Sequence, residues 1–155
     1  MTAAILAALP LVFAAGTPVV WNFGQPALEG RAAPGATVKV KLGARIQESW
    51  RLYSLKRAEG GPIPTRITLP EGQPFALAGA IEASEPIRLH DPVFDMEIEF
   101  YAGSAEFVLP VKVAAGARPG AATLKVAARY QICDDKQCLP PRTVTLELPV
   151  TVAAP

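Results

Sequence analysis

The sequence predicts an all-β fold, an immunoglobulin-like β-sandwich, and three observations support this prediction. Its 155 residues include 16 prolines and 12 glycines spread along the chain, a composition that excludes long helices. Several short segments alternate between apolar and polar residues, and none shows the periodicity of an amphipathic helix. Turn signals recur about every 8–12 residues, a spacing typical of such sandwiches.

The first half of the chain contains two expected strands and a loop. In residues 36–42 (ATVKVKL) an apolar side chain occupies every second position, with lysines between them, as in a half-buried strand. Residues 50–55 (WRLYSL) predict the next strand, with Trp50 and Leu52 on one face. Residues 59–64 contain a glycine pair and two prolines, so we expect a loop there.

The rest of the chain predicts further strands, for a total of about eight or nine in one domain. They are expected at residues 65–69, 75–80, 94–101, 105–113, 121–133 and 143–152, with a turn at residues 102–103. Alternation is clearest in the last two strands, whose inward-facing residues are Leu124, Val126, Ala128, Tyr130, Ile132, Val144, Leu146, Leu148 and Val150.

The composition excludes several classes of function. The 15 basic and 14 acidic residues give a net charge of +1, so no strong field attracts nucleic acid or an anionic membrane surface. Half of the residues are apolar and 19% are charged, which fits neither a disordered tail nor a membrane bundle. The single histidine excludes a zinc site built on several histidines.

Residues 1–16 (MTAAILAALPLVFAAG) are expected to be a signal peptide that precedes a domain at residues 17–155. The apolar run at residues 3–15 is 13 residues long, which fits a signal peptide and is short for a spanning helix. Because no Lys or Arg precedes this run, an uncleaved anchor, a misassigned start or a buried strand remain open. Export to the periplasm or another extracytoplasmic space would place the cysteines where disulfides persist.

The two cysteines, Cys133 and Cys138, are the strongest chemical feature of the sequence. Four residues separate them and strand signals flank both sides, so a hairpin would set them opposite each other on neighbouring strands. Directly opposed residues have Cα atoms about 4.5–5.5 Å apart, which suits a disulfide. Cys133 lies on the strand face opposite Tyr130 and Ile132, so it need not be buried.

The residues alone leave three roles open for this pair. A structural disulfide would close a loop of only six residues, which contributes about 2 kcal/mol in the loop-entropy account. A strained, accessible disulfide would instead exchange readily and serve a redox function. A metal site would require Cys133, Cys138, an aspartate and His90 to converge.

Four segments carry a resemblance to a known family. They are residues 50–54 (WRLYS), 60–65 (GGPIPT), 91–94 (DPVF) and 130–141 (YQICDDKQCLPP). In this order they resemble the N-terminal periplasmic domain of the thiol:disulfide interchange protein DsbD. The last segment is the most specific, and the resemblance spans residues 21–152.

The resemblance implies an immunoglobulin-like domain that exchanges disulfides and needs no cofactor. Such a domain relays electrons between thioredoxin-like proteins through mixed disulfides. By residue type and position, Cys138 resembles the cysteine that bonds to the partner and Cys133 the resolving one. Phe94 resembles the aromatic residue of a cap over the disulfide.

Three further site residues are implied by the same resemblance. Tyr53 resembles a tyrosine that forms a wall of the site, and His90 and Asp91 would flank the cap. The residues themselves also allow purely structural roles, with Phe94 in the core and His90 in a surface loop. Asp134 and Asp135 are expected to be turn residues. Lys136 would either lower the pKa of a thiol or point to water.

The 155 residues contain neither a multi-span membrane domain nor a thioredoxin-like domain with Cys-x-x-Cys. We therefore expect a stand-alone, monomeric module whose reductant is a separate protein, with no membrane contact beyond an N-terminal anchor. The alternative is a non-catalytic immunoglobulin-like docking module in which the disulfide is structural. A third, weaker alternative is an extracytoplasmic copper or zinc binder.

Overall fold

The computed structural model describes residue 13 and residues 16–155, and every regular element in this part is a strand. The all-β prediction is therefore confirmed. The expected signal peptide at residues 1–16 lies almost entirely outside the described residues, so its presence and cleavage stay predictions.

Twelve strands follow one another along the described chain. They are β1 (Val19–Glu29), β2 (Thr37–Ile46), β3 (Arg51–Tyr53), β4 (Arg66–Thr68), β5 (Phe75–Leu77), β6 (Glu82–Ala83), β7 (Ile87–Asp91), β8 (Met96–Tyr101), β9 (Ser104–Val113), β10 (Gly120–Tyr130), β11 (Ile132–Cys133) and β12 (Arg142–Val152).

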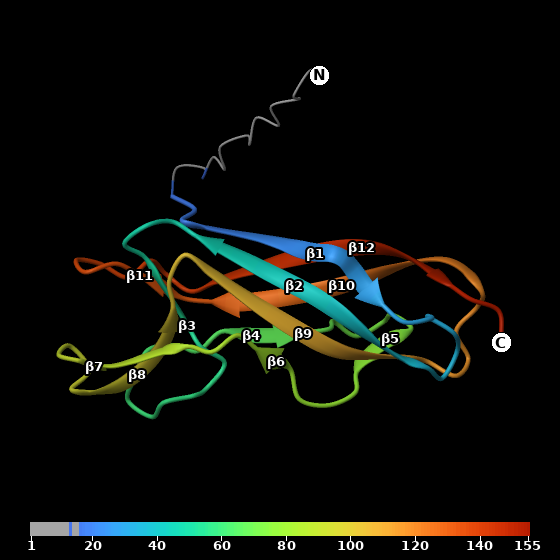
Figure 1. The fold of residues 1–155 in the computed structure, drawn as a ribbon, viewed down its shortest axis with the longest axis horizontal. Helices are drawn as coiled ribbons and strands as arrows, with labels where there is room; N and C mark the ends of the chain where they lie inside the picture. The colour runs from blue at the N-terminus through green and yellow to red at the C-terminus, as the bar shows by residue number, and fades with distance from the viewer. Residues whose placement is uncertain (1–12, 14–15) are drawn as a thin grey trace, which may run out of the picture.

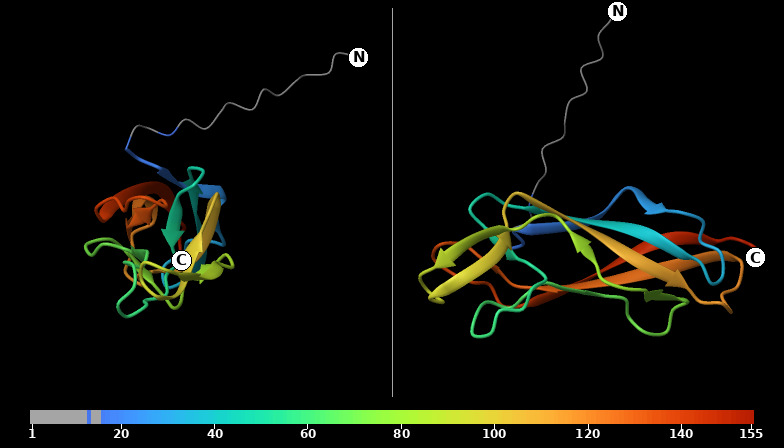
Figure 2. Two further views of the ribbon diagram at one scale, coloured as in Figure 1. Left: turned by 90° about the vertical axis from the view of Figure 1, so that its left-hand side faces the viewer. Right: turned by 60° about the horizontal axis from the view of Figure 1, so that its bottom comes forward.

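The strands pair into three antiparallel sheets. The first has the order β1-β2-β9-β5, with β6 also paired to β9, and the second has the order β12-β10-β4. These two sheets form the layers of an elongated sandwich (Figures 1 and 2). Trp21 of β1 joins the layers, because its ring lies 5.9 Å from that of Phe107 in β9 and 5.5 Å from that of Tyr130 in β10.

Alternating side chains build the core between these layers. Val40 and Leu109 are directly paired in the ladder between β2 and β9, and both are completely buried. Leu124 and Val126 are equally buried on β10. Because alternate residues of a strand face opposite sides, the lysines of β2 remain at the surface, as the alternation predicted.

The third sheet, in the order β11-β3-β8-β7, lies at the end of the molecule opposite the C-terminus (Figure 1). It has its own small apolar cluster, separate from the main core, that contains Tyr53, Ile98, Phe100 and Cys133. Short strands build this sheet, and the loops between them gather at one end. The cysteines, β3 and the hairpin of β7 and β8 are thereby brought together.

The sequence pattern missed three strands and merged two others. β1 contains Gly24 and Pro26 and shifts register between Phe23 and Leu28, which interrupts its alternation. β6 has only two residues, and most of β7 is exposed on both faces, so neither shows an apolar period. The predicted strand at residues 121–133 is divided at Gln131 into β10 and β11.

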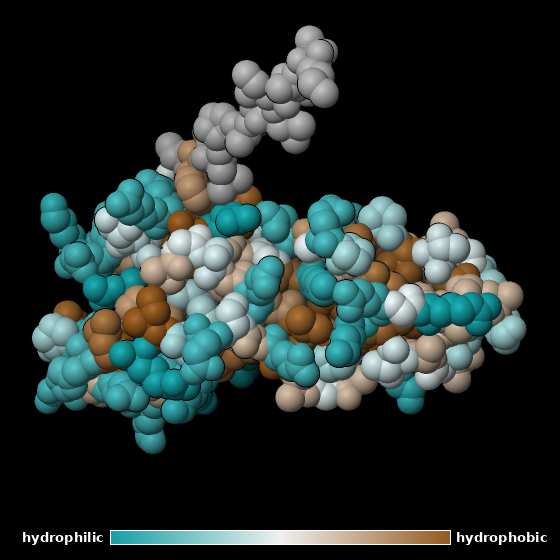
Figure 3. All heavy atoms as spheres, viewed as in Figure 1, coloured by the Kyte–Doolittle hydropathy of each residue, from teal (hydrophilic) through white to brown (hydrophobic). Residues whose placement is uncertain are grey.

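The outer surface carries mixed polarity. The face in Figure 3 is largely hydrophilic, with apolar residues in separate patches. No helix among the described residues has the length and apolar character needed to cross a membrane.

Candidate functional site

A disulfide joins Cys133 and Cys138 at the tip of the hairpin that leaves β11. The two residues form an isolated antiparallel bridge, as the spacing predicted, with Cα atoms 4.0 Å apart and an S–S bond of 2.04 Å. Beyond the bond, the N–H of Leu139 donates to the carbonyl of Ile132 at 3.0 Å. The bond therefore closes a hairpin that backbone hydrogen bonds also hold. We call residues 133–138 the cysteine loop.

Asp134 organises the cysteine loop. Its Oδ1 accepts hydrogen bonds from the N–H groups of Lys136 and Gln137, both at 2.8 Å, while its own N–H donates to the carbonyl of Gln137. The hydrogen bonds from Lys136 and Gln137 lower the pKa of the Asp134 carboxyl. The expectation that this aspartate is a turn residue is confirmed, since such side chains favour turns by bonding to nearby backbone.

The two cysteines differ in exposure. Cys133 is only 3% exposed, whereas Cys138 is an exposed residue. The sequence pattern left Cys133 free to lie at the surface, and the structure shows a different arrangement. Because the chain breaks at Gln131, β11 pairs with β3 of the third sheet, and Cys133 turns into the small apolar cluster.

Tyr53 forms part of the apolar floor beneath Cys133. It is 3% exposed and belongs to the same cluster as Ile98 and Phe100, so its side chain is buried. Burial raises the pKa of its phenol, and the nearby Asp91 carboxylate raises it further, while Arg51 lowers it. The hydroxyl of Tyr53 therefore stays protonated at neutral pH.

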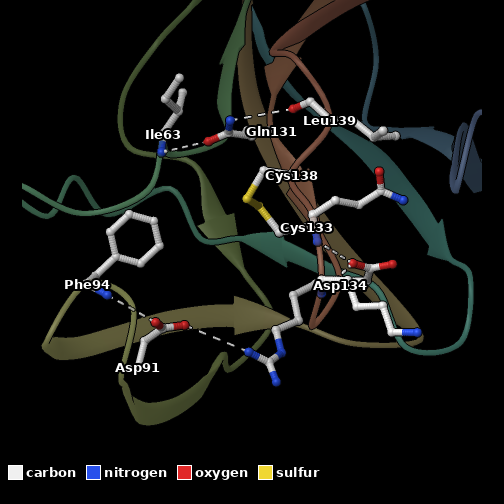
Figure 4. The surroundings of a disulfide bond; sticks show 11 residues. Ile63, Asp91, Phe94, Gln131, Cys133, Asp134, Cys138 and Leu139 are labelled. Atoms are coloured by element: carbon white, nitrogen blue, oxygen red, sulfur yellow. Dashed lines mark hydrogen bonds and ion pairs between the residues drawn. A yellow bond between two sulfur atoms is a disulfide. The ribbon is translucent and has the colours of Figure 1, made fainter.

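The turn at residues 91–95, which we call the cap turn, joins β7 to β8. Asp91 is 6% exposed, and its Oδ1 accepts hydrogen bonds from the N–H groups of Val93 at 2.8 Å and Phe94 at 3.2 Å. Phe94 is half-buried, and Figure 4 shows its ring on the side of the turn that faces the disulfide. The buried carboxylate thus fixes the backbone that presents this ring.

Arg51 lies between the cap turn and the cysteine loop. It is paired with Cys133 in the ladder of β3 and β11, and its guanidinium stacks over the Phe100 ring at 5.1 Å. One guanidinium nitrogen is 3.0 Å from Oδ1 of Asp135, and the other is 3.9 Å from Oδ2 of Asp91. One cation therefore contacts a carboxylate from each of the two segments around the disulfide.

His90 lies in the same hairpin but on its outer side. Its Nε2 is 3.2 Å from Oδ1 of Asp95, and the side chains are 63% and 93% exposed. His90 therefore precedes the cap turn at the surface, whereas Asp91 is its first residue and is buried. Among the described residues no group of three His, Cys, Asp or Glu side chains gathers as metal ligands would.

Gln131 connects the site to the loop before β4. Its Oε1 accepts a hydrogen bond from the N–H of Ile63 at 3.4 Å, and its Nε2 donates to the carbonyl of Leu139 at 3.5 Å (Figure 4). The glycine- and proline-rich loop is thereby attached to the residue that follows Cys138.

Sequence reasoning missed Arg51 and Gln131 as parts of this site. Both stand inside the segments that carried the family resemblance, at residues 50–54 and 130–141. Their roles depend on contacts with residues 84 and 68 positions away in the chain, and no local pattern encodes such contacts.

Comparisons with known proteins agree with this geometry. The sequence pattern of the family described as "Thiol:disulfide interchange protein DsbD, N-terminal" matches residues 24–149. The reduced N-terminal domain of DsbD from Neisseria meningitidis is 18% identical, with a TM-score of 0.51 over 80% of this chain and 82% of that one. A comparison with curated proteins gives no match.

A second solved structure is similar over part of its length. The N-terminal periplasmic domain of ScsB from Proteus mirabilis is 15% identical, with a TM-score of 0.51 over 84% of this chain and 44% of that one. The predicted immunoglobulin-like β-sandwich is confirmed by these similarities of fold. From the family match over most of its length, the chain belongs to the DsbD N-terminal family of thiol–disulfide exchange domains.

Proposed function

We propose that this domain relays electrons between thioredoxin-like proteins through reversible opening of the Cys133–Cys138 disulfide. The observation that carries the proposal is the asymmetry of the bond, which has one exposed cysteine and one cysteine buried in an apolar cluster. In a disulfide of this kind, a partner can attack the exposed cysteine. The buried cysteine then attacks the mixed disulfide when the domain's own disulfide forms again.

The exchange takes place in two displacements at sulfur. A thiolate of the reduced partner attacks Sγ of Cys138, the Cys133–Cys138 bond breaks, and Cys133 leaves as a thiolate that takes up a proton. The other cysteine of the same partner then attacks, as a thiolate, the partner sulfur of the mixed disulfide. This step forms the partner's own disulfide and releases Cys138. The partner is oxidised by two electrons and the domain is reduced by two. The reverse sequence passes these electrons to a second partner.

The surroundings of Cys138 suit an approaching protein. Pro140 and Pro141 follow it at exposed positions outside any strand, and β12 begins only at Arg142. Since proline has no N–H group, this backbone makes few ladder bonds of its own. The cap turn lies on the other side of the disulfide, where Phe94 would shield the bond from small thiols until a partner displaces it.

The partners and the compartment are part of the proposal. The similar domain of ScsB is periplasmic, which supports an extracytoplasmic location for this chain as well. Its partners would be thioredoxin-like proteins that meet it there, one as electron donor and another as acceptor. The expectation of a monomer that requires no cofactor belongs to the same proposal.

The reduction potential of the Cys133–Cys138 pair tests the proposal. We expect equilibration with a dithiothreitol or glutathione buffer series to give a potential clearly above about −300 mV, in the range of exchangeable disulfides. A potential below that limit would mark a structural bond. The docking-module function would then be the better account.

A further inference from the structure

Three arginines line an open pocket beside the candidate site. The pocket has a volume of about 470 Å³, and Arg57, Arg66 and Arg129 contribute to its wall together with the loop at residues 58–64. We call it the arginine pocket. These arginines come from three parts of the chain, namely the loop after β3, the start of β4 and the end of β10.

The arginines of this pocket lack carboxylate partners. No carboxylate oxygen in the described chain lies within ion-pair distance of any of the three guanidinium groups, although Glu59 also lines the pocket. Arg66 and Arg129 moreover stand directly opposite each other in the ladder of β4 and β10. Like charges directly opposite each other destabilise a sheet, and an anion bound between them would relieve this repulsion.

The carboxylates around the disulfide are, by contrast, already engaged. Asp91 binds the cap turn and Arg51, Asp134 binds the cysteine loop, and Asp135 pairs with Arg51. The guanidinium groups of the arginine pocket are therefore available to a carboxylate from outside, and the exposed Lys136 of the cysteine loop adds a further positive charge at this end.

The arginine pocket is close enough to the disulfide for one partner to reach both. Ile63 of its wall is joined through Gln131 to Leu139, the residue after Cys138. Arg129 precedes Cys133 by four residues, which is about 13 Å of extended chain. A typical interface covers about 800 Å² on each partner, a disc about 16 Å in radius, so both features fit beneath one docked protein.

We propose that the arginine pocket binds carboxylate side chains that surround the reactive cysteine of the exchange partner. This inference rests on the proposed function, since it describes how a partner is selected for the same disulfide. Guanidinium groups bind carboxylates through paired N–H donors, which makes arginine suited to this recognition. The pocket thereby orients a partner with an acidic rim and disfavours one with a basic rim.

Charge complementarity of this kind acts mainly on the rate of association. Opposite charges near a docking site speed encounter by one to three orders of magnitude. At 0.1 M salt, charges more than about 10 Å apart are largely screened from each other. The proposal therefore predicts that the exchange rate depends on the charge beside the attacking thiol, and that this dependence disappears at high ionic strength.

Three synthetic thiol peptides test this prediction. They carry one cysteine in the same sequence and differ only in two flanking residues, which are Glu, Gln or Lys. At low ionic strength we expect the Glu peptide to reduce the disulfide about 10-fold faster than the Lys peptide. Replacement of Arg66 and Arg129 (R66Q/R129Q) should lower this ratio to about 3 or less, because two of the three positive charges of the pocket are lost.

A matched control separates the pocket from the total charge. The K112Q/R118Q variant removes the same charge from exposed positions outside the arginine pocket, and its ratio should stay within about 2-fold of the parent. Dithiothreitol carries no charged residue beside its reacting thiolate, so it should reduce R66Q/R129Q and K112Q/R118Q, which lose the same charge, at equal rates. A parent ratio near one, or a ratio that R66Q/R129Q leaves unchanged, would overturn the inference.

A binding measurement keeps this inference distinct from the proposed function. The Glu peptide with serine in place of cysteine should shift the amide NMR signals of Gly60 and Gly61 in the parent and not in R66Q/R129Q. If no peptide reduces the disulfide, the proposed function fails. This titration still decides whether the arginine pocket binds carboxylates. Absence of shifts in the parent would contradict carboxylate binding directly.

Discussion

Asp134 holds the two cysteines in register through contacts made by one side chain. Its Oδ1 accepts two backbone N–H groups of the cysteine loop while the S–S bond between Cys133 and Cys138 is formed. We expect these hydrogen bonds to weaken when reduction frees the loop, so they favour the disulfide over the dithiol. A single turn residue in this way influences the equilibrium between dithiol and disulfide.

Replacing Asp134 should make the disulfide easier to reduce. Asp134→Ala removes both acceptor contacts, and because a hydrogen bond contributes about 0.5–1.5 kcal/mol, we expect the exchange equilibrium with glutathione to shift about 2- to 10-fold toward the dithiol. Asp134→Asn keeps an acceptor oxygen at the same position, so its shift should be smaller. Equal shifts in both variants would assign the effect to charge and not to loop geometry.

Asp91 is the second residue whose contacts prepare the site. Asp91→Ala should free the backbone of the cap turn and leave Arg51 with one carboxylate, which lowers the free energy of unfolding by about 1–3 kcal/mol. It should also speed reduction by dithiothreitol, since the cap turn would no longer be fixed. Asp95→Asn is the control, because asparagine tolerates the positive φ of 50° at this position and the exposed Asp95 carboxylate pairs with His90. An identical effect of both substitutions would contradict a specific role for Asp91.

At the level of elements, the cap turn and the cysteine loop are the two segments around the disulfide, and we expect them to control access to it. The cap turn belongs to the hairpin of β7 and β8, and the cysteine loop follows β11. Arg51 on β3 pairs with a carboxylate from each of them, so movement of either segment disturbs a shared contact.

Phe94 should control access to the disulfide and contribute little to the core. Phe94→Ala is expected to speed reduction by excess dithiothreitol, while the urea midpoint falls by the equivalent of about 1 kcal/mol or less, as at sites outside a packed core. A core phenylalanine would instead cost about 3–5 kcal/mol. An unchanged reduction rate together with such a loss would refute the cap role.

Alternation predicted most strands and failed for β1, β6 and β7. β2, β9 and β10 bury alternate residues of a long run and β12 buries or half-buries them, so their pattern is visible in the sequence. β7 has four exposed residues in succession and carries no such pattern. The cysteine pairing followed from spacing, whereas the burial of Cys133 depended on a break in the strand that no turn residue marks.

For the whole molecule, most of the core lies between the sandwich sheets and not in the cluster around Cys133. The main core also takes in Leu52, Tyr101 and Ile132 of the third sheet, whereas Cys133 itself belongs to the separate small cluster. We therefore expect the domain to open and close its disulfide without unfolding. The double variant C133A/C138A should accordingly keep a cooperative thermal transition, since the bond contributes only about 2 kcal/mol. Loss of that transition would show that the disulfide is structural.

Alkaline pH should weaken the fold through its three tyrosines, Tyr53, Tyr101 and Tyr130. Burial raises the pKa of each above the ordinary value of 10.0. Their contribution to stability is complete below pH 10, where both states are protonated, and is lost as the pH rises toward the folded pKa values, because the unfolded chain ionises first. Absorbance at 295 nm should therefore titrate at higher pH in the native protein than in urea. Coincident curves would contradict the burial of these phenols.

Trapping of a mixed disulfide tests most directly whether Cys138 exchanges with a partner. Each single-cysteine variant is incubated with a thioredoxin-like protein that lacks its own resolving cysteine and carries an activated disulfide at the other. The account predicts that Cys133→Ala, which keeps the exposed Cys138, accumulates the mixed disulfide on a non-reducing gel. Cys138→Ala, which keeps only the buried Cys133, should not. The reverse pattern, or the absence of any adduct with Cys133→Ala, would contradict the account.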